Sequence, residues 1–107
     1  MTRDNIFTVL QTLKIPAAYS HFRRERSDPV EPPYIVYIGA GQTVDRADNT
    51  HVWSLNRYQV EYYFKEKDET QEAAIESALL SGGYQFVKSE DLYLEDEDLF
   101  VIYYETN

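Results

Sequence analysis

The sequence contains no cysteine, only one methionine and two histidines, and no long apolar run. Without thiols, the chain can form no disulfide, no thiolate metal site and no cysteine nucleophile. No apolar stretch approaches the roughly 20 residues that a membrane-spanning helix needs. The first residues, MTRDNIFTVLQTLKIP, lack the apolar segment and cleavage site of a secretory signal. We therefore expect a protein that starts in the cytoplasm and does not associate with a membrane.

Glycine and proline are also scarce, with four of each in 107 residues. A chain of this length fits one domain, so we expect residues 1–107 to form a single unit. Hydrophobic residues make up 43% of the chain and aromatic residues 15%, which is enough for one core. The length of the chain leaves no room for a cofactor domain beside a substrate domain.

Positive charge is missing from the second half of the chain. Residues 1–57 carry seven basic and six acidic side chains, whereas residues 58–107 carry three lysines against thirteen acids. The total net charge of -9 therefore comes from the C-terminal half. Such a surface repels nucleic-acid phosphates, which are bound through lysine and arginine. We expect no direct sequence-specific binding of nucleic acid, and a partner with a basic patch.

The segment DNIFTVLQTLK predicts a short amphipathic helix. Ile6, Leu10 and Leu13 recur at helical spacing, Asp4 is a possible N-cap, and Pro16 closes the segment. A short apolar piece follows, and then a mixed-charge, proline-bearing stretch over residues 23–32, which we expect to be a mobile loop.

Two strands are expected next. The run YIVYI, residues 34–38, is rich in β-branched and aromatic residues. The run WSLNRYQVEYYF, residues 53–64, alternates with a period of two, so that its even-numbered residues from 58 to 64 form the core face. Trp53 and Leu55 are out of phase with this face, which indicates either a bulge or packing on the opposite side. The glycine-containing stretch 39–50 between the two runs predicts a hairpin tip.

The best helix signal is KDETQEAAIESALLSGG. Asp68 is the expected N-cap with Gln71 three residues later, and Gly82 and Gly83 mark the end. Its buried face is predicted to contain Ala74, Ile75, Ala78 and Leu79.

The C-terminal segment predicts two strands joined by an acidic turn at residues 95–98. The last strand, residues 99–104, is apolar on both faces, so it belongs in the middle of a sheet or under an oligomer interface. The expected fold class is α+β, a mostly antiparallel β-sheet with helices packed on one face, in the order α-β-β-α-β-β.

The stretch VYIGAGQTV invites comparison with a phosphate-binding loop. A dinucleotide fingerprint needs a third glycine, where this chain has Val44, and a helix after it, where this chain has turn formers. A Gly-Lys-Ser/Thr P-loop is absent as well. We expect no nucleotide and no other cofactor.

No catalytic or metal-binding pattern stands out. His21 and His51 are the only imidazoles, and neither has the surroundings of a hydrolase triad. The acidic run SEDLYLEDED lacks the pattern of a calcium loop and is more simply a solvated turn. Glu72 and Glu76 lie four residues apart and are expected to face solvent. The sequence therefore predicts no catalytic and no metal site, and a protein that is not an enzyme.

The ten tyrosines are the most distinctive part of the composition. Tyrosine and tryptophan are favoured at protein interfaces, where one end of the side chain is apolar and the other is wet. Tyr37, Tyr63 and Tyr103 are predicted to lie on the strand faces opposite the core, together with Trp53. Either they line an ordinary second hydrophobic layer or they form an interface.

Three segments carry a resemblance to a known family: PPYIVYIGAGQTVDRADNTHVW, YQVEYYFKEKDETQEAAIESAL and EDLFVIYYE. Together they resemble the small tail-terminator or minor tail proteins of long-tailed phages and Gram-positive prophages. The similarity runs from about Pro16 to Glu105 and rests on scaffold motifs. It implies an α+β fold and a homo-oligomeric ring, with a hexamer as the expected form. It further implies tail-tube and head-completion proteins as partners, and location in the virion tail after assembly in the host cytoplasm.

In a head-to-tail ring, each copy offers two different surfaces, so a basic loop of one copy could face an acidic region of the next. The basic candidates are Arg23, Arg24 and Arg26, and the acidic candidates are Glu95, Asp96, Glu97 and Asp98. The alternative is a non-enzymatic acidic adaptor or DNA mimic that occupies a basic protein. Neighbouring capsid and tail genes favour the first hypothesis, and an isolated gene favours the second.

Overall fold

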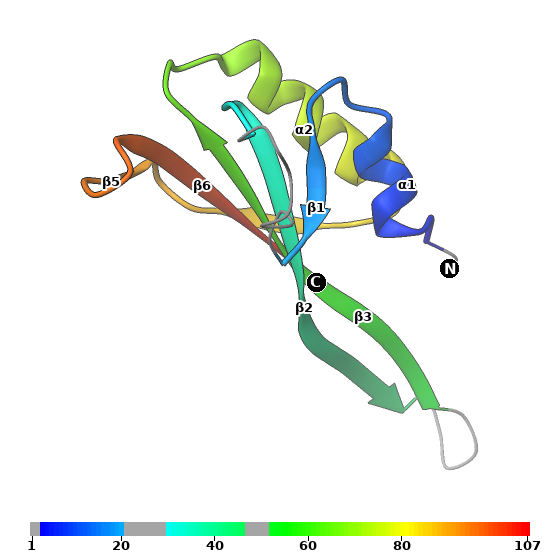
Figure 1. The fold of residues 1–107 in the computed structure, drawn as a ribbon. Helices are drawn as coiled ribbons and strands as arrows, with labels where there is room; N and C mark the ends of the chain where they lie inside the picture. Colours follow the sequence, from blue (N-terminus) through cyan, green and yellow to red (C-terminus); the bar gives the residue numbers. More distant parts are fainter. Residues whose placement is uncertain (1–2, 21–29, 47–51) are drawn as a thin grey trace.

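A six-stranded β-sheet carries both helices on one of its faces (Figure 1). The computed structural model describes residues 3–20, 30–46 and 52–107, and the side chains of 43–46 and 52–54 lie outside the description. The helices are α1 (Ile6–Gln11) and α2 (Glu69–Ser81). The strands are β1 (Ala17–Tyr19), β2 (Tyr34–Arg46), β3 (Val52–Phe64), β4 (Phe86–Lys88), β5 (Leu92–Leu94) and β6 (Leu99–Thr106).

The order of the strands is β1-β2-β3-β6-β4, and β5 also pairs with β6. Among the described strands, only the β1–β2 pair is parallel, so the expected α+β class with a mostly antiparallel sheet is confirmed. Two short strands were not expected. β1 forms where only an apolar piece was predicted, and the segment before the acidic turn divides into β4 and β5. A strand of three residues leaves too little alternation for a sequence pattern to reveal it.

Helix α1 begins one residue later than predicted. The side chain of Asn5, and not that of Asp4, caps it, since its Oδ1 accepts hydrogen bonds from the amides of Phe7 at 2.9 Å and Thr8 at 3.4 Å. Both residue types are good N-caps, so the sequence alone could not separate two neighbouring candidates. The amide of Asp4 instead donates to the carbonyl of Gly82, which ties α1 to the end of α2.

Helix α2 has the predicted ends. The carboxylate of Asp68 accepts a hydrogen bond from the Gln71 amide at 3.2 Å, and Gly83 has a φ of 92° immediately after the C-cap Gly82. The buried face differs from the prediction. Ile75 and Leu79 are buried as expected, but Ala74 is exposed and Glu72 takes part in the buried face.

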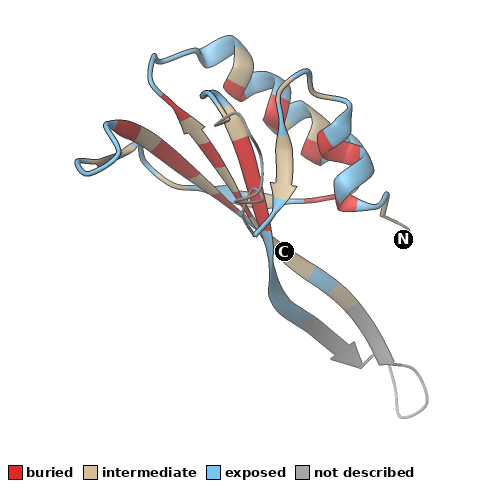
Figure 2. Cartoon of the chain, in the orientation of Figure 1, coloured by how far each residue is buried: buried red, intermediate tan, exposed pale blue. Residues whose placement is uncertain are grey.

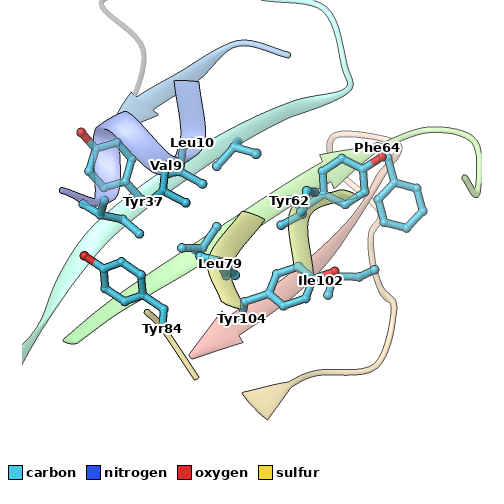
Figure 3. Packing of buried hydrophobic residues seen from close by; sticks show 13 residues of the cluster. Val9, Leu10, Tyr37, Tyr62, Phe64, Leu79, Tyr84, Ile102 and Tyr104 are labelled. Carbon is cyan, nitrogen blue, oxygen red and sulfur yellow. The ribbon is translucent and has the colours of Figure 1, made fainter. Parts of the chain in front are cut away.

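The body of β3 follows the predicted alternation. Val60, Tyr62 and Phe64 are almost fully buried beneath the helices, with exposed fractions of 0%, 1% and 2%. They belong to one cluster with residues of α1, α2, β2 and β6. Figure 3 shows Val9 and Leu10 of α1 turned toward the same space. The hydrophobic core therefore lies between the helices and one face of the sheet.

β2 is longer than predicted, because the strand continues through the glycines to Arg46 instead of turning at residue 39. The prediction of a hairpin tip at 39–50 was therefore wrong for residues 39–46, and residues 47–50 lie outside the described residues. Gly39 is paired with Tyr58 and Gln42 with Asn56, so β2 contains one residue more than β3 over this interval. Gly41 has a φ of 91°, which glycine adopts without strain. A bulge in β2 thus explains the glycines.

Beyond the bulge, β2 and β3 leave the sheet as a two-stranded ribbon (Figure 1). We call residues 42–46 and 52–56 the arm. The described side chains of the arm, those of Gln42, Leu55 and Asn56, are exposed or half-buried (Figure 2). Buried residues gather instead on the helices and the body of the sheet.

The acidic turn forms where it was predicted, with residues 95–98 between β5 and β6. β6 lies inside the sheet, between β3 on one side and β4 and β5 on the other. Val101 and Ile102 point to opposite faces of β6, and each has an exposed fraction of 0%. The prediction that this apolar strand belongs in the middle of a sheet is confirmed.

Candidate interaction surface

The face of the sheet opposite the helices carries most of the tyrosines that the sequence assigned to an interface. Strand pairing places its residues side by side across β2, β3, β6 and β4. We call this the helix-free face and define it by Tyr34, Val36, Ile38, Gln59, Glu61, Tyr63, Val87, Val101, Tyr103 and Glu105.

Tyr63 and Tyr103 lie on the helix-free face, as predicted. The ring of Tyr63 stacks on that of Tyr34 with 5.1 Å between the centroids. Its hydroxyl donates a hydrogen bond of 2.6 Å to Glu61 Oε1, and Gln59 Nε2 donates one of 3.0 Å to Glu61 Oε2. Burial raises the pKa of Tyr63, and the hydrogen bond to Glu61 raises it further. Aromatic surface and fixed polar groups are thus combined, as is typical of protein interfaces.

The prediction for Tyr37 was wrong, because this side chain lies in the core. Tyr37 is only 8% exposed and faces α1, where its ring stacks on Phe7 at 6.2 Å between centroids. Figure 3 shows it beside Val9 and Leu10. The run 34–38 is apolar on both faces, so its alternation did not decide which face α1 would cover.

The remaining predicted interface residues fall in three places. Arg23, Arg24 and Arg26 lie outside the described residues, as do His21 and His51. Trp53 occupies a described position in β3, opposite Asp45 in the arm, but its side chain lies outside the description. The four acids from Glu95 to Asp98 form the turn between β5 and β6.

The acidic turn is exposed and held in shape by its own residues. The hydroxyl of Tyr93 donates a hydrogen bond of 2.7 Å to Asp98 Oδ1, which raises the pKa of Tyr93. Tyr93, Leu94, Glu95, Asp96 and Glu97 line a shallow hollow of about 510 Å³. The turn therefore presents several carboxylates to solvent on a defined backbone.

A second feature, which the sequence reasoning missed, is a cluster of charges around Glu72. The prediction that Glu72 and Glu76 face solvent was wrong, since the Glu72 side chain is 3% exposed and that of Glu76 is 28% exposed. Lys67 Nζ and Lys88 Nζ each donate a hydrogen bond of 3.0 Å to Glu72 Oε1. Lys67 Nζ also lies 2.8 Å from Glu72 Oε2, outside hydrogen-bonding geometry, so that contact is electrostatic.

The lysines of this cluster have further acidic partners. Lys88 Nζ lies 2.9 Å from Glu76 Oε2, and Lys67 Nζ lies 3.0 Å from Asp91 Oδ2. Hydrogen bonding to Glu72 is the main reason why the pKa of Lys67 is raised to about 12. Hydrogen bonding to Glu76 is the main cause of the raised pKa of Lys88. Because each lysine is held protonated between carboxylates, the cluster ties α2 to β4 and is poorly suited to proton transfer.

Within residues 3–20, 30–46 and 52–107, no three histidine, aspartate or glutamate side chains are grouped to hold a metal ion. Neither α1 nor α2 has the length and apolar character to cross a membrane. The helix-free face and the arm are thus the strongest candidates for a functional surface in the described part of the chain.

Comparison with known proteins adds no family assignment. No family model matches the chain, and no curated protein matches it closely enough to count as a relative.

Proposed function

We propose that the chain is a structural protein of a phage or prophage virion, a tail terminator or head–tail joining component. In this proposal it assembles into a ring at the end of the tail tube, with six copies as the expected number. The observation that carries the proposal is the helix-free face, where Tyr34, Tyr63 and Tyr103 are half-buried on a side of the sheet that neither helix covers.

Two properties of the fold support an assembly role. The arm extends β2 and β3 beyond the sheet, and a two-stranded ribbon in water gains stability from a partner surface. The hydroxyl of Tyr63 and one N–H of Gln59 are already paired with Glu61, so a partner surface that offers a positive charge to the Glu61 carboxylate could cover both donors. Both properties suit a subunit that is completed by its neighbours.

The resemblance to tail-terminator proteins in residues 16–105 is the reason for proposing the phage tail as the assembly to which the chain belongs. Under this proposal the partners are the chain itself, the tail-tube protein and the head-completion proteins. The protein is present in the host cytoplasm during assembly and in the tail of the finished virion, and it performs no catalysis.

Charge complementarity supplies one possible contact of the ring. The acidic turn of one copy would face Arg23, Arg24 and Arg26 of the next. Light scattering at low and high salt tests this contact, because screening weakens exposed ion pairs. We expect the apparent mass to fall as salt rises. A monomer under both conditions would count against a preformed ring, and co-sedimentation with tail tubes would then decide whether the ring forms only on the tail.

A second candidate function is that of an acidic adaptor or DNA mimic. The exposed carboxylates of the turn between β5 and β6 favour it, because they form a compact negative surface. This function predicts salt-sensitive binding to a basic protein and competition by DNA for that protein. The tail function predicts neither, so a competition experiment separates the two.

A further inference from the structure

The arm lacks the support that the rest of the sheet has. β1 pairs with β2 only at residues 35–37, and β6 pairs with β3 only at residues 59–64. Between Gln42 and Arg46, β3 is the only strand of the described residues that pairs with β2. An isolated two-stranded ribbon is at best marginally stable in water, and its outer backbone edges are open to pairing. The arm therefore has the properties of a segment that packs against another surface.

One described apolar side chain of the arm lies on the helix-free side of β3. In the body, Val60 and Tyr62 face the helices, and Gln59, Glu61 and Tyr63 lie on the opposite side. The bulge lies in β2, so the alternation of β3 continues unbroken into the arm. Leu55, which is half-buried, therefore shares the side of Gln59 and Tyr63, whereas the exposed Asn56 lies on the helix side. The apolar position of the arm at Leu55 thus continues the helix-free face.

The helix-free face ends in a groove that could receive such positions. Gln59, Val87, Ser89, Tyr103 and Glu105 line a hollow of about 400 Å³. Val87 lies on the edge strand β4 and is 62% exposed, so it offers apolar surface at this hollow. The arm of the same copy starts at Asn56, near Gln59 of this groove, and runs away from the sheet (Figure 1), so it does not fill the groove.

We propose that the apolar side of the arm, at Leu55, docks in the groove between Val87 and Tyr103 of a second copy of the chain. The proposal rests on the proposed function, because it names a second contact between neighbouring copies of the ring, beside that of the acidic turn.

Charge favours a second copy as the occupant. Residues 42–57 contain two arginines and two aspartates, so this segment carries no net charge in a chain whose total is -9. It can approach an acidic copy without the repulsion that the C-terminal half would meet. Arg57, at the base of the arm, has a buried Nε atom without a hydrogen-bond partner, and the groove carries the exposed carboxylate of Glu105.

The contact would be heterologous, since an arm meets a groove and not another arm. Repetition of a heterologous contact closes into a ring when the rotation between copies permits it and gives an open chain otherwise. Each copy uses its arm on one neighbour and its groove on the other. Variants with one damaged surface should therefore complement each other.

The experiment uses Leu55→Arg, which damages the arm, and Val87→Arg, which damages the groove. Leu80→Arg is the matched control, because Leu80 is 58% exposed on α2, away from the helix-free face. Sedimentation equilibrium measures self-association, and the emission of Trp53, the single tryptophan, reports the surroundings of the arm. Circular dichroism and thermal unfolding verify that each variant is folded.

We expect the wild type and Leu80→Arg to associate with a blue shift of tryptophan emission. The association constants of Leu55→Arg and of Val87→Arg should each be lower than that of the wild type by a factor of roughly ten or more, because docking would bury an unpaired charge. An equimolar mixture of these two variants should form a dimer, since one intact arm and one intact groove remain. Its tryptophan emission should shift to the blue.

Three results would overturn the inference: a wild type that is monomeric at all concentrations, a mixture that stays monomeric, or a Val87→Arg variant that associates like the wild type. The proposed function is tested separately by co-sedimentation with tail tubes. A Val87→Arg variant that still forms rings on tubes would refute the arm contact and leave the tail function standing.

Discussion

Removing the two lysines that face Glu72 should destabilise the fold more than removing Glu72 itself. The carboxylate is 3% exposed, whereas the Lys67 and Lys88 side chains are 45% and 35% exposed. In the variant Glu72→Gln, both lysines regain water and keep Asp91 and Glu76 as partners. In the double variant Lys67→Met with Lys88→Met, the carboxylate stays buried without a cation.

The magnitudes follow from burial. Two hydrogen bonds between charged groups would contribute about 1.5–3 kcal/mol each, and the half-exposed lysines reduce this through solvent screening. We therefore expect Glu72→Gln to lower the free energy of unfolding by about 1–3 kcal/mol. Leaving a buried charge uncompensated costs roughly 3–5 kcal/mol, which sets the expectation for the double lysine variant.

Urea unfolding, followed by circular dichroism, measures these free energies. Adding Glu72→Gln to the double lysine variant should restore part of the stability, because it removes the unpaired charge. The exposed Glu90→Gln is the control and should change the free energy of unfolding by less than about 0.5 kcal/mol. A double lysine variant that is more stable than Glu72→Gln, or an added Glu72→Gln change that restores no stability, would contradict this role of the buried carboxylate.

Three further changes test the packing and the titration of the core by urea unfolding. Gly82→Ala places a Cβ atom 2.5 Å from Val9 Cγ2, so we expect the free energy of unfolding to fall by about 1–3 kcal/mol. Adding Val9→Ala should restore part of this loss. If Gly82→Ala costs nothing, α1 is not held against α2. Thr106→Val removes the hydroxyl that accepts a hydrogen bond from the Tyr58 amide at 2.8 Å and donates one to the Tyr58 carbonyl at 3.1 Å. We expect this variant to lose about 1–3 kcal/mol of the free energy of unfolding. The control Thr106→Ser, which keeps the hydroxyl, should change it little. Burial raises the pKa of Tyr62 from 10.0 to about 12, so an unfolded chain releases this proton first. The contribution of Tyr62 to the free energy of unfolding should be fully present below pH 10 and should fall as the pH rises toward 12. A free energy of unfolding that stays constant over this range, or a Tyr62→Phe variant with the same pH dependence as the wild type, would contradict this role of Tyr62.

The elements with strong local signals were predictable from the sequence. The cap at Asp68 and the glycines after α2 act over a few residues, so their pattern fixes the helix ends wherever the helix packs. The alternation of residues 58–64 likewise fixes which side of β3 is buried.

The features that depend on distant residues were not predictable. Glu72 is buried because Lys88, sixteen residues away, reaches it across the fold, and no helical periodicity contains that contact. Tyr37 is buried because α1 happens to cover that side of β2. Gly39 and Gly41 read as a hairpin tip, although a bulge uses glycine equally well and lets the strand continue. Of the interface residues predicted, the structure brings Tyr63 and Tyr103 together on the helix-free face and places Tyr37 elsewhere.

Electron microscopy of tail tubes mixed with the purified protein shows whether the protein forms a ring at the end of a tube. The tubes should come from a phage of the same kind that lacks its terminator. We expect ring-shaped density at one end of each tube. Protein that stays free of the tubes, or decorates them along their sides, would contradict this expectation.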